Sequence, residues 1–237
     1  MYGWQESLLS QFGDSLNNDD LLCELRTHAC DIGFEFFAFG IRAPMPVSRP
    51  HIVMHNNYPV EWQRRYAEQR YLTSDPSIPK ALRSSLPVVW SDDLFAESPQ
   101  LWDEARQFQL RHGCAQSHID GGGVRSLLTF ARAHEVVTQY EVDAKAQRLQ
   151  WLTHLLHQRF LDRLGDALLP EAAVKLAERE VEVLRWTAEG KTSADIAEIL
   201  RISERTVNFH LNNASAKLGT CNKTAASVKA ALLGLIW

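Results

Sequence analysis

The sequence lacks the features that direct a chain out of the cytoplasm or into a membrane. Cysteine is scarce, and Cys23, Cys30, Cys114 and Cys221 are far apart and form no CxxC pair, which argues against a disulfide framework or a zinc site. The N-terminus has neither the basic region nor the apolar core of a secretory signal. No apolar run approaches the roughly 18 residues that span a bilayer. We therefore expect a cytoplasmic protein with no membrane partner, metal or cofactor.

An excess of positive charge, which would favour nucleic-acid binding, is also missing from the chain as a whole, because 25 Lys/Arg stand against 29 Asp/Glu. The distribution is uneven, however. Residues 176–237 hold eight Lys/Arg and seven Asp/Glu, net +1, whereas the residues before them hold 17 and 22, net −5. From Arg205 onward there are four Lys/Arg and no acidic residue. Such a modest positive excess fits a DNA-binding surface, and it equally fits a surface that contacts only solvent.

A length of 237 residues and a hydrophobic content of 45% are typical of a globular protein with one or two domains. Residues 163–176 carry a Gly and a Pro after a long helical pattern, and this predicts a linker. Before the linker, helical and strand patterns alternate, and Gly121–Gly123 marks a hairpin. The predicted helices are 18–30, 59–71, 100–111 and 138–164, and the predicted strands are 34–41, 51–55, 86–90, 115–119 and 126–131.

These patterns predict an α+β fold. We expect an N-terminal α-β-α sandwich with a five-stranded antiparallel sheet in residues 1–163, a linker in 164–176 and a C-terminal four-helix helix-turn-helix domain in 177–237. The aromatic residues of the strands are expected to be core. The long helix 138–164 carries an apolar stripe that is either a dimer seam or core of the same chain. The stripe consists of Leu149, Leu152, Leu156 and Phe160.

Capping residues divide the C-terminal domain into short helices. The T-x-x-D sequence Thr192–Asp195 is a capping box, Ser203 is a typical N-cap, and Gly190 and Gly219 end helices. The predicted helices are 177–188, 193–200, 203–218 and 222–235. A short helix, a tight turn and an amphipathic helix are typical of a helix-turn-helix, although the spacing alone also fits a generic helical bundle.

The third of these helices has two contrasting faces. Its apolar stripe, at i, i+4, i+7 and i+11, is expected to face the bundle and consists of Val207, Leu211, Ala214 and Leu218. The opposite face carries Arg205, Asn208, Asn212 and Ala216. Arg and Asn side chains can pair with guanine and adenine edges in the major groove, so this helix is the predicted recognition helix.

The C-terminal domain contains the segments EREVEVLRWTAEGKT (178–192), ISERTVNFH (202–210) and Asn222-Lys223. These segments resemble the signature of LuxR-type regulators. The resemblance runs without a gap from residue 176 to about 236. It implies double-stranded DNA as a partner, action as a homodimer and a contact with RNA polymerase. One departure is Ala177, where the family usually has Thr; losing this cap should cost about 1 kcal/mol of helix stability.

The residues expected to contact DNA divide by role. Lys191 and Lys223 lie at the edges of the helix pair, where a cation would meet phosphate, and Arg205 lies on the face expected to meet bases. The full set is Lys191, Thr192, Ser203, Arg205, Thr206, Asn208, Asn212, Lys217 and Lys223. The last helix, with Val228, Leu232 and Leu235, is a second candidate dimer seam and equally candidate core.

The N-terminal domain contains YPVEWQRRY (58–66), Asp75-Pro76 and PVVW (87–90). These segments resemble the acyl-homoserine-lactone-binding domain of the quorum-sensing LuxR-type regulators. Residues 36–42 and 111–113 resemble that domain too. The resemblance implies a small-molecule autoinducer as the ligand.

The side chains suit such a ligand chemically. The indole N–H of Trp62 can only donate, which suits the lactone carbonyl, whereas the Asp75 carboxylate accepts, which suits the amide N–H. The Tyr58 hydroxyl can donate to the amide carbonyl. Trp90 would flank the lactone ring and Tyr66 the acyl tail. The alternatives are that Trp62 and Tyr66 are core residues, one helical turn apart, and that Asp75 is only a turn residue.

Ala38 stands where some relatives have a hydroxyl. The hydrogen bond to the ligand's amide is then absent, or it is made by Thr129 or a water. Ala38 and Gly40 share one face of a strand, and their small size would leave room for a longer or substituted acyl chain.

We therefore predict a ligand-responsive bacterial transcription factor and not an enzyme. A lactonase or acylase would need a nucleophile–base pair or a metal cluster, and the nine histidines are scattered. The remaining alternative is a LuxR-type regulator whose first domain binds a different small molecule or needs none.

Overall fold

The computed structural model describes residues 3–13, 17–168 and 174–236. The chain forms two compact units. The first unit comprises Met1–Arg42, Ile52–Ile119 and Arg125–Arg163. The second comprises Ala43–His51, Asp120–Val124 and Leu164–Trp237.

In the described part of the first unit, five antiparallel strands form one sheet in the order β2-β1-β5-β4-β3. The predicted five-stranded antiparallel sheet is confirmed. The strands are β1 (Phe36–Arg42), β2 (Ile52–Asn56), β3 (Val88–Val89), β4 (His112–Ile119) and β5 (Arg125–Arg132). Gly123, with φ of +77°, lies in the predicted hairpin between β4 and β5, where only glycine adopts the backbone conformation without strain.

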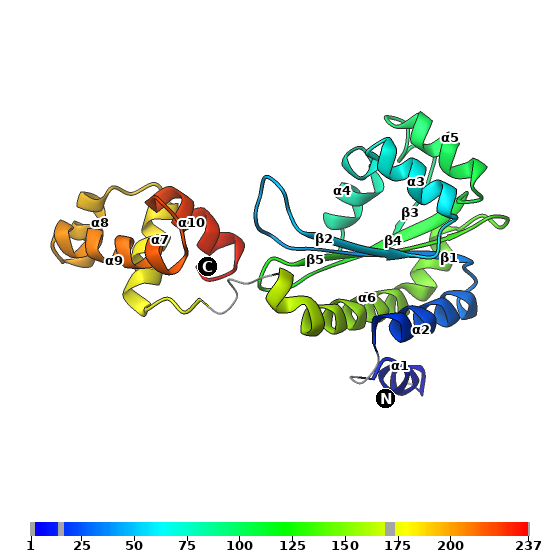
Figure 1. Ribbon diagram of the computed structural model, residues 1–237, viewed down its shortest axis with the longest axis horizontal. Coiled ribbons are helices and arrows are strands. Elements are labelled where there is room, and N and C mark those ends of the chain that lie inside the picture. Colours follow the sequence, from blue (N-terminus) through cyan, green and yellow to red (C-terminus); the bar gives the residue numbers. More distant parts are fainter. Residues whose placement is uncertain (1–2, 14–16, 169–173, 237) are drawn as a thin grey trace. The chain divides into compact units, whose positions relative to one another are not determined.

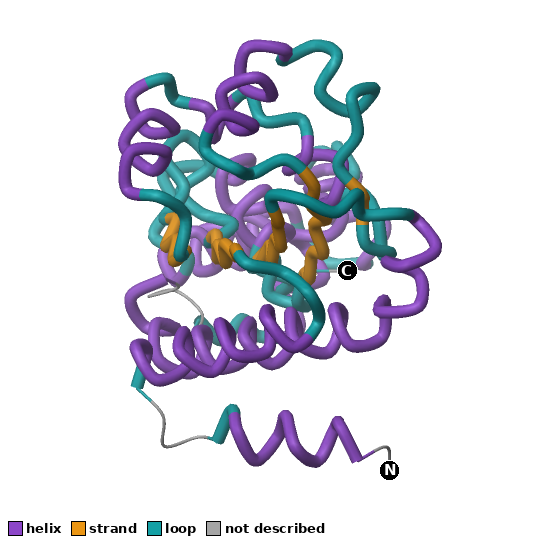
Figure 2. Tube along the Cα trace, turned by 90° about the vertical axis from the view of Figure 1, so that its right-hand side faces the viewer, coloured by secondary structure: helices purple, strands orange, loops and turns teal. Residues whose placement is uncertain are grey.

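Helices cover both faces of this sheet (Figure 1). One face carries α3 (Val60–Glu68), α4 (Ser77–Leu82) and α5 (Pro99–Gln107), and the other carries α2 (Asn18–Asp31) and α6 (Gln139–Leu168). α1 (Gly3–Gln11) lies outside the layer of α2 and α6 (Figure 2). The predicted α-β-α sandwich is therefore present.

Alternation along β1 separates the two faces. Phe37, Phe39 and Ile41 are buried, whereas the residues between them are partly exposed. Phe39 packs against Phe160 of α6, with ring centroids 5.0 Å apart. The stripe of α6 predicted as seam or core, Leu149, Leu152, Leu156 and Phe160, is fully buried, so it is core of the chain itself.

Several elements differ from the prediction. The helix expected to reach residue 71 ends at Glu68, because Arg70 takes a left-handed conformation with φ of +54° and a short 3-10 helix, Tyr71–Thr73, follows. The strand expected at 86–90 is only Val88–Val89. The helices α1 and α4 were not predicted from the sequence. Residues 164–168 of the expected linker continue α6, and residues 169–173 lie outside the described part.

The second unit contains the predicted helices in the predicted order. They are α7 (Glu178–Ala188), α8 (Ser193–Leu200), α9 (Glu204–Lys217) and α10 (Lys223–Leu232). The stripe of α9, Val207, Leu211, Ala214 and Leu218, is buried in the bundle as predicted. Within the described residues, no helix has both the length and the hydropathy needed to cross a membrane.

Candidate functional site

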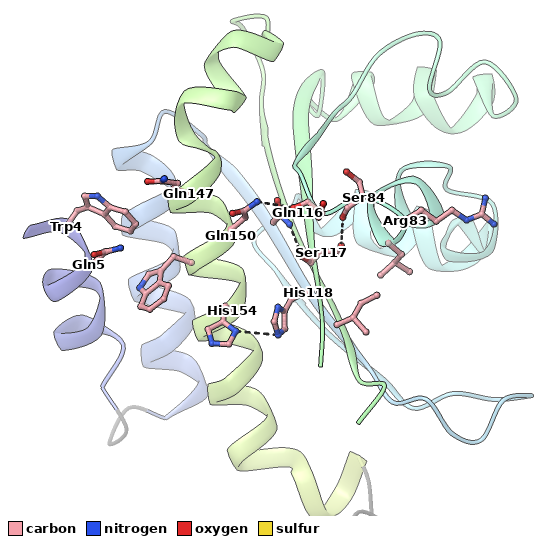
Figure 3. A pocket seen from close by; sticks show the side chains of 14 residues that line it. Trp4, Gln5, Arg83, Ser84, Gln116, Ser117, His118, Gln147, Gln150 and His154 are labelled. Carbon is pink, nitrogen blue, oxygen red and sulfur yellow. Dashed lines mark hydrogen bonds between the residues drawn. The ribbon is translucent and has the colours of Figure 1, made fainter. Parts of the chain in front are cut away.

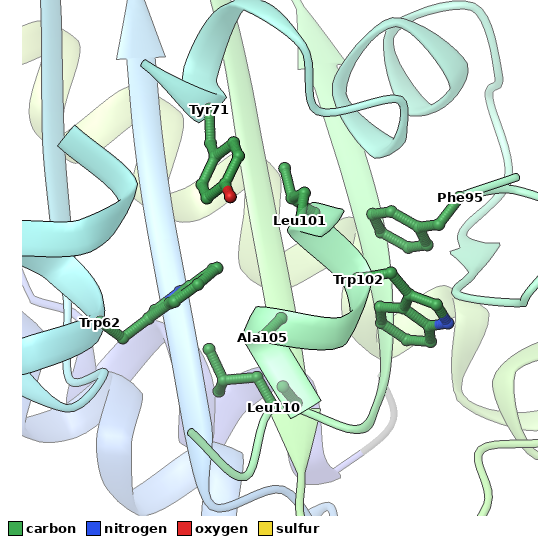
Figure 4. Close-up of a cluster of buried hydrophobic side chains, with 8 residues drawn as sticks. Trp62, Tyr71, Phe95, Leu101, Trp102, Ala105 and Leu110 are labelled. Atoms are coloured by element: carbon green, nitrogen blue, oxygen red, sulfur yellow. The ribbon is translucent and has the colours of Figure 1, made fainter. Parts of the chain in front are cut away.

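The four aromatic side chains predicted to bind the ligand, Tyr58, Trp62, Tyr66 and Trp90, gather in one place. They belong to an aromatic cluster, part of which Figure 4 shows. Its buried members are Trp62, Tyr71, Phe95, Leu101, Trp102, Ala105, Leu110 and Ala131. Six partly buried residues pack against these: Phe36, Tyr58, Tyr66, Trp90, Leu94 and Phe108.

Trp62 and Tyr66 lie one turn apart on α3 and face this cluster. Their ring centroids are 5.7 Å apart, and Trp62 also stacks on Tyr71 at 6.0 Å. Trp62 is 3% exposed. This packing is what the core alternative predicts. Ligand binding by the two side chains stays a prediction.

Asp75 is a turn residue that also contacts Tyr66. Its Oδ1 accepts hydrogen bonds from the Ser77 amide (2.9 Å) and the Ser77 hydroxyl (2.6 Å), which start α4. Its Oδ2 accepts one from the Tyr66 hydroxyl at 3.0 Å. Burial raises the pKa of the Asp75 carboxyl, and the hydrogen bonds from Ser77 and Tyr66 oppose that shift. The carboxylate therefore joins the turn to the aromatic cluster.

Tyr58 and Thr129 form a short chain of hydrogen bonds. The Thr129 hydroxyl donates to the Ala38 carbonyl at 3.2 Å and lies 3.0 Å from the Tyr58 hydroxyl. Because Thr129 has only one hydroxyl hydrogen, Tyr58 is the donor of the second bond. Burial raises the pKa of Tyr58, so its phenol stays protonated. Ala38 and Thr129 are cross-strand neighbours. A Cβ added to Gly40 would meet only the Val53 carbonyl oxygen, at an ordinary contact distance of 4.0 Å.

Trp90 lies against the backbone of Gly113. A Cβ on Gly113 would come within 2.6 Å of the Trp90 ring, so only glycine allows this approach. The ring meets Phe95 and Trp102 edge to face, at 6.1 and 6.2 Å. Its indole N–H is buried and has no hydrogen-bond partner in the described part of the chain. Trp90 thus offers a hydrogen-bond donor besides the flat surface that the sequence predicts.

The sequence patterns did not reveal a partly buried carboxylate, Glu104, that is bonded to Tyr71 of the cluster. Glu104 of α5 accepts hydrogen bonds from the Arg65 guanidinium (2.7 and 2.6 Å), from the Tyr71 hydroxyl (2.9 Å) and from Gln100 (3.0 Å). The bonds from Arg65 lower the pKa of Glu104 to about 2. Residues 65 and 104 are 39 positions apart, so no local spacing could have revealed that they tie α3 to α5.

A large hollow lies elsewhere in the first unit. It has a volume of about 910 Å³ and is lined from α1, α4, β4 and α6 (Figure 3). None of the predicted ligand-binding residues lines it. His118 and His154 meet there, with Nε2 and Nδ1 3.4 Å apart. Among the described residues, no group of three or more His, Cys, Asp or Glu side chains is arranged to hold a metal ion.

In the second unit, capping side chains fix the ends of the helices. Thr192 forms the predicted box with Asp195: the Thr192 amide donates to Oδ2 at 2.8 Å, and the Asp195 amide donates to Oγ1 at 3.2 Å. The Ser203 hydroxyl accepts from the Thr206 amide at 3.1 Å, while Asn222 caps α10. At Ala177 only half of a box exists, because its amide donates to Glu180 at 2.7 Å and alanine offers no side-chain acceptor.

The predicted base-reading side chains lie on one exposed face of α9. Arg205, Asn208 and Asn212 are all exposed. Phe209, which the sequence pattern did not single out, is 59% exposed on the same face. A hollow of about 420 Å³ beside the start of α10 brings Asn208 and Asn212 together with Lys223. Lys191 is exposed just before α8.

Lys217, another predicted DNA contact, forms an ion pair within the bundle. Its Nζ lies 2.7 Å from Oε2 of the buried Glu180. Burial raises the pKa of Glu180, but the ion pair with Lys217 and the Ala177 amide outweigh it, so the pKa is lowered overall. The pair connects the first turn of α7 to the last turn of α9, and a contact of Lys217 with DNA stays a prediction.

Comparisons with known proteins agree with this arrangement. The family model described as "Autoinducer binding domain" matches residues 17–160, and the model described as "Bacterial regulatory proteins, luxR family" matches residues 174–230. The chain is 41% identical to the transcriptional activator protein AnoR of Acinetobacter nosocomialis, over 100% of both chains. It is 39% identical to the HTH-type quorum-sensing regulator RhlR of Pseudomonas aeruginosa, over 98% of this chain and 96% of the relative.

Solved structures give the same result. The crystal structure of SdiA from Escherichia coli superposes with a TM-score of 0.79 at 34% identity and covers 100% of this chain and 99% of that one. SdiA in complex with octanoyl-rac-glycerol superposes with a TM-score of 0.76 at 34% identity, over 99% and 96%. Since both family models match in order and these relatives align over nearly their whole length, the chain belongs to the LuxR family of autoinducer-binding transcriptional regulators.

Proposed function

We propose that this regulator binds an N-acyl-homoserine lactone in the aromatic cluster of the first unit and, as a homodimer, binds an inverted repeat in double-stranded DNA. In this proposal Trp62 donates to the lactone carbonyl and Asp75 accepts from the amide N–H. When the ligand binds, Tyr58 turns its hydroxyl hydrogen from Thr129 to the amide carbonyl, and Thr129, bonded to the Ala38 carbonyl, lies beside it. Trp90 flanks the ring, Tyr66 the tail, and the small residues Ala38 and Gly40 leave room for the acyl chain.

The observation that carries the proposal is the set of polar groups inside an otherwise aromatic cluster. Asp75, Tyr66, Tyr58 and Thr129 come from α3, β5 and two loops, yet each has a hydrogen bond to another member of the set. A mostly apolar site with a few placed polar groups is typical of small-ligand pockets. The unpartnered N–H of Trp90 adds a donor that a ligand carbonyl would satisfy.

The test is the melting temperature of the full chain against acyl-homoserine lactones of different length and 3-substituent. A ligand at a hundred times its Kd should stabilise the native state by about 2.7 kcal/mol. Mass spectrometry of protein co-purified with a lipid extract would identify the ligand independently. If no lactone shifts the melting temperature, the lactone proposal is wrong.

A second candidate ligand is an acylglycerol, because a relative that aligns with almost the whole chain was solved in complex with octanoyl-rac-glycerol. Its ester carbonyl and hydroxyls could use the same donors and acceptors, but it has no amide N–H for Asp75. Including 1-octanoyl-rac-glycerol in the panel, with and without Asp75→Asn, separates the two classes. The lactone should lose most of its effect in Asp75→Asn, because its amide N–H can only donate, whereas an acylglycerol hydroxyl can also accept from the new NH2 group and should lose less.

For DNA, we propose that α9 enters the major groove. Lys191 and Thr192 at the start of α8 and Lys223 at the start of α10 would meet phosphates, where the helix dipoles add to the positive charge. The residues proposed to lie beside these phosphate contacts are Ser203, Thr206 and Lys217. Those proposed to face bases are Arg205, Asn208 and Asn212.

We further propose that the protein acts in the cytoplasm, contacts RNA polymerase and has no enzymatic role.

The homodimer and the domain bounds have their own tests. We propose domains at 1–163 and 177–237 joined by 164–176, with the seam formed by exposed side chains of α6 and by Val228 of α10, which is 49% exposed. Sedimentation with and without ligand should show a dimer that the ligand favours. Limited proteolysis should cut first within 164–176. If the protein binds an inverted repeat as a monomer, the dimer proposal is wrong. If the first proteolytic cut falls outside 164–176, the proposed domain bounds are wrong.

A further inference from the structure

One buried hydroxyl in the second unit is hydrogen-bonded to a side chain of the recognition helix. Ser193, the first residue of α8, donates from Oγ to Oδ1 of Asn208 on α9 at 2.8 Å. Ser193 is 9% exposed, whereas Asn208 is exposed. One end of the amide is therefore held from inside the domain, and the other end is presented to solvent.

This bond determines which end of the amide faces outward. An asparagine amide has a carbonyl that accepts and an NH2 that donates. If the amide were turned over, the hydroxyl hydrogen of Ser193 would lose its acceptor in a buried position, and an unsatisfied buried donor is costly. The bonded orientation directs the two N–H groups of Nδ2 away from Ser193.

The surroundings of Asn208 make the outward face rich in donors. Asn208 lines the hollow of about 420 Å³ together with Asn212 and Lys223. With Oδ1 bonded to Ser193, the atoms that Asn208 can offer to a group entering there are the N–H groups of Nδ2, and Lys223 can offer its ammonium. In the major groove, guanine presents two acceptors, N7 and O6, whereas cytosine presents an amino donor.

We propose that Ser193 is a positioning residue for DNA recognition: it holds Asn208 with its N–H groups outward and so selects a base edge that presents an acceptor, and rejects the cytosine amino donor, at one base pair of each half-site. This inference rests on the proposed contact of Asn208 with a base edge. Ser193 itself touches no base. Its effect on specificity passes through Asn208.

The experiment selects operators from a library of randomised inverted repeats with the full chain and N-octanoyl-homoserine lactone, or with 1-octanoyl-rac-glycerol if only that probe raises the melting temperature. Binding of wild type, Ser193→Ala, Asn208→Ala and the double variant is then measured on the operator and on single-base-pair changes. Ser193→Ala should reduce discrimination at the base pair that Asn208→Ala affects, by about three- to tenfold. The double variant should discriminate as Asn208→Ala does.

Two further variants serve as controls. Ser227→Ala removes another buried hydroxyl of the same unit, which donates to the Lys223 carbonyl at 3.0 Å within α10, and it should keep full discrimination. Ser193→Thr keeps the hydroxyl and should restore discrimination. If Ser193→Ala does not fold, as judged by its melting curve, Ser193→Gly removes the same hydroxyl.

Each outcome bears on a separate statement. If Asn208→Ala leaves discrimination unchanged, or if the wild type selects no sequence, the base contact of Asn208 is wrong and this inference falls with it. If Asn208→Ala relaxes one position but the Ser193 variants do not, the inference alone is wrong. An additive loss in the double variant would mean that Ser193 acts by another route.

Discussion

Replacing Asp75 by Asn tests the ligand site with the least damage to the fold. The Asp75 carboxylate has two distinct tasks, since Oδ1 accepts from Ser77 and starts α4, while Oδ2 accepts from Tyr66. Asparagine keeps an oxygen for Ser77, so the turn and α4 should survive. At the Oδ2 position it puts an NH2 group, which would meet the ligand's amide N–H donor to donor.

The expected loss follows from the bond that disappears. A hydrogen bond to a charged partner contributes about 1.5–3 kcal/mol, which corresponds to a roughly 10- to 150-fold increase in the Kd of an acyl-homoserine lactone. Titration calorimetry, or the ligand-induced shift in melting temperature, measures it. Asp92→Asn is the matched control, because this carboxylate accepts from Trp102 and Arg106 and is not a predicted ligand contact. An unchanged lactone response in folded Asp75→Asn protein would show that Asp75 is only a turn residue.

Ala38→Ser adds a hydroxyl beside Thr129 and should change the order of preference among lactones; superimposable dose responses for the whole panel would mean that Ala38 does not line the pocket. Lys191→Ala should weaken binding to every DNA sequence and flatten the salt dependence by about one unit, whereas Arg205→Ala should relax discrimination at one position by about 1–3 kcal/mol and keep the slope. Salt titrations on a selected and a scrambled operator compare them, and an equal loss on both for Arg205→Ala would make that residue a backbone contact. Glu104 has a pKa lowered to about 2 by Arg65, so its stabilisation is complete above the ordinary value of 4.5 and is lost as the pH falls toward 2. Glu104→Gln should therefore lower the melting temperature at pH 7. The melting temperature of the variant should also fall less than that of the wild type between pH 4.5 and 2. If the melting temperatures of the two proteins fall in parallel across that range, Glu104 does not stabilise the fold in this way.

Local rules predicted the second unit well, because its helix ends depend on residues three positions apart. Ser203 with Thr206 and Asn222 with Ala225 are such pairs, and the stripe that begins at Val207 repeats at helical spacing. The same rules failed at α4, which is six residues long and contains Pro79. That helix depends on the side chain of Asp75, and the sequence shows the Asp-Pro pair but not the hydrogen bond to Ser77.

The motif predicted which residues would gather in the cluster that we propose as the ligand site, but it did not predict the contacts among them. Trp62, Tyr66 and Asp75 are close in sequence, so their proximity could be expected. The contacts of Tyr58 with Thr129 and of Arg65 with Glu104 join residues 71 and 39 positions apart. Contacts at such separations depend on strand order and helix packing, which a single sequence does not specify.

The ion pair between Glu180 and Lys217 also limits how this DNA-binding domain can change during evolution or engineering. Losing either partner alone leaves a charge without its counterpart, and for the buried Glu180 that is costly. Replacing both at once with apolar residues of similar size can be neutral or favourable. A library that varies these two positions together should therefore contain folded domains that no library of single substitutions reaches. A recognition helix grafted from a relative would need the matching residue on α7 transferred with it.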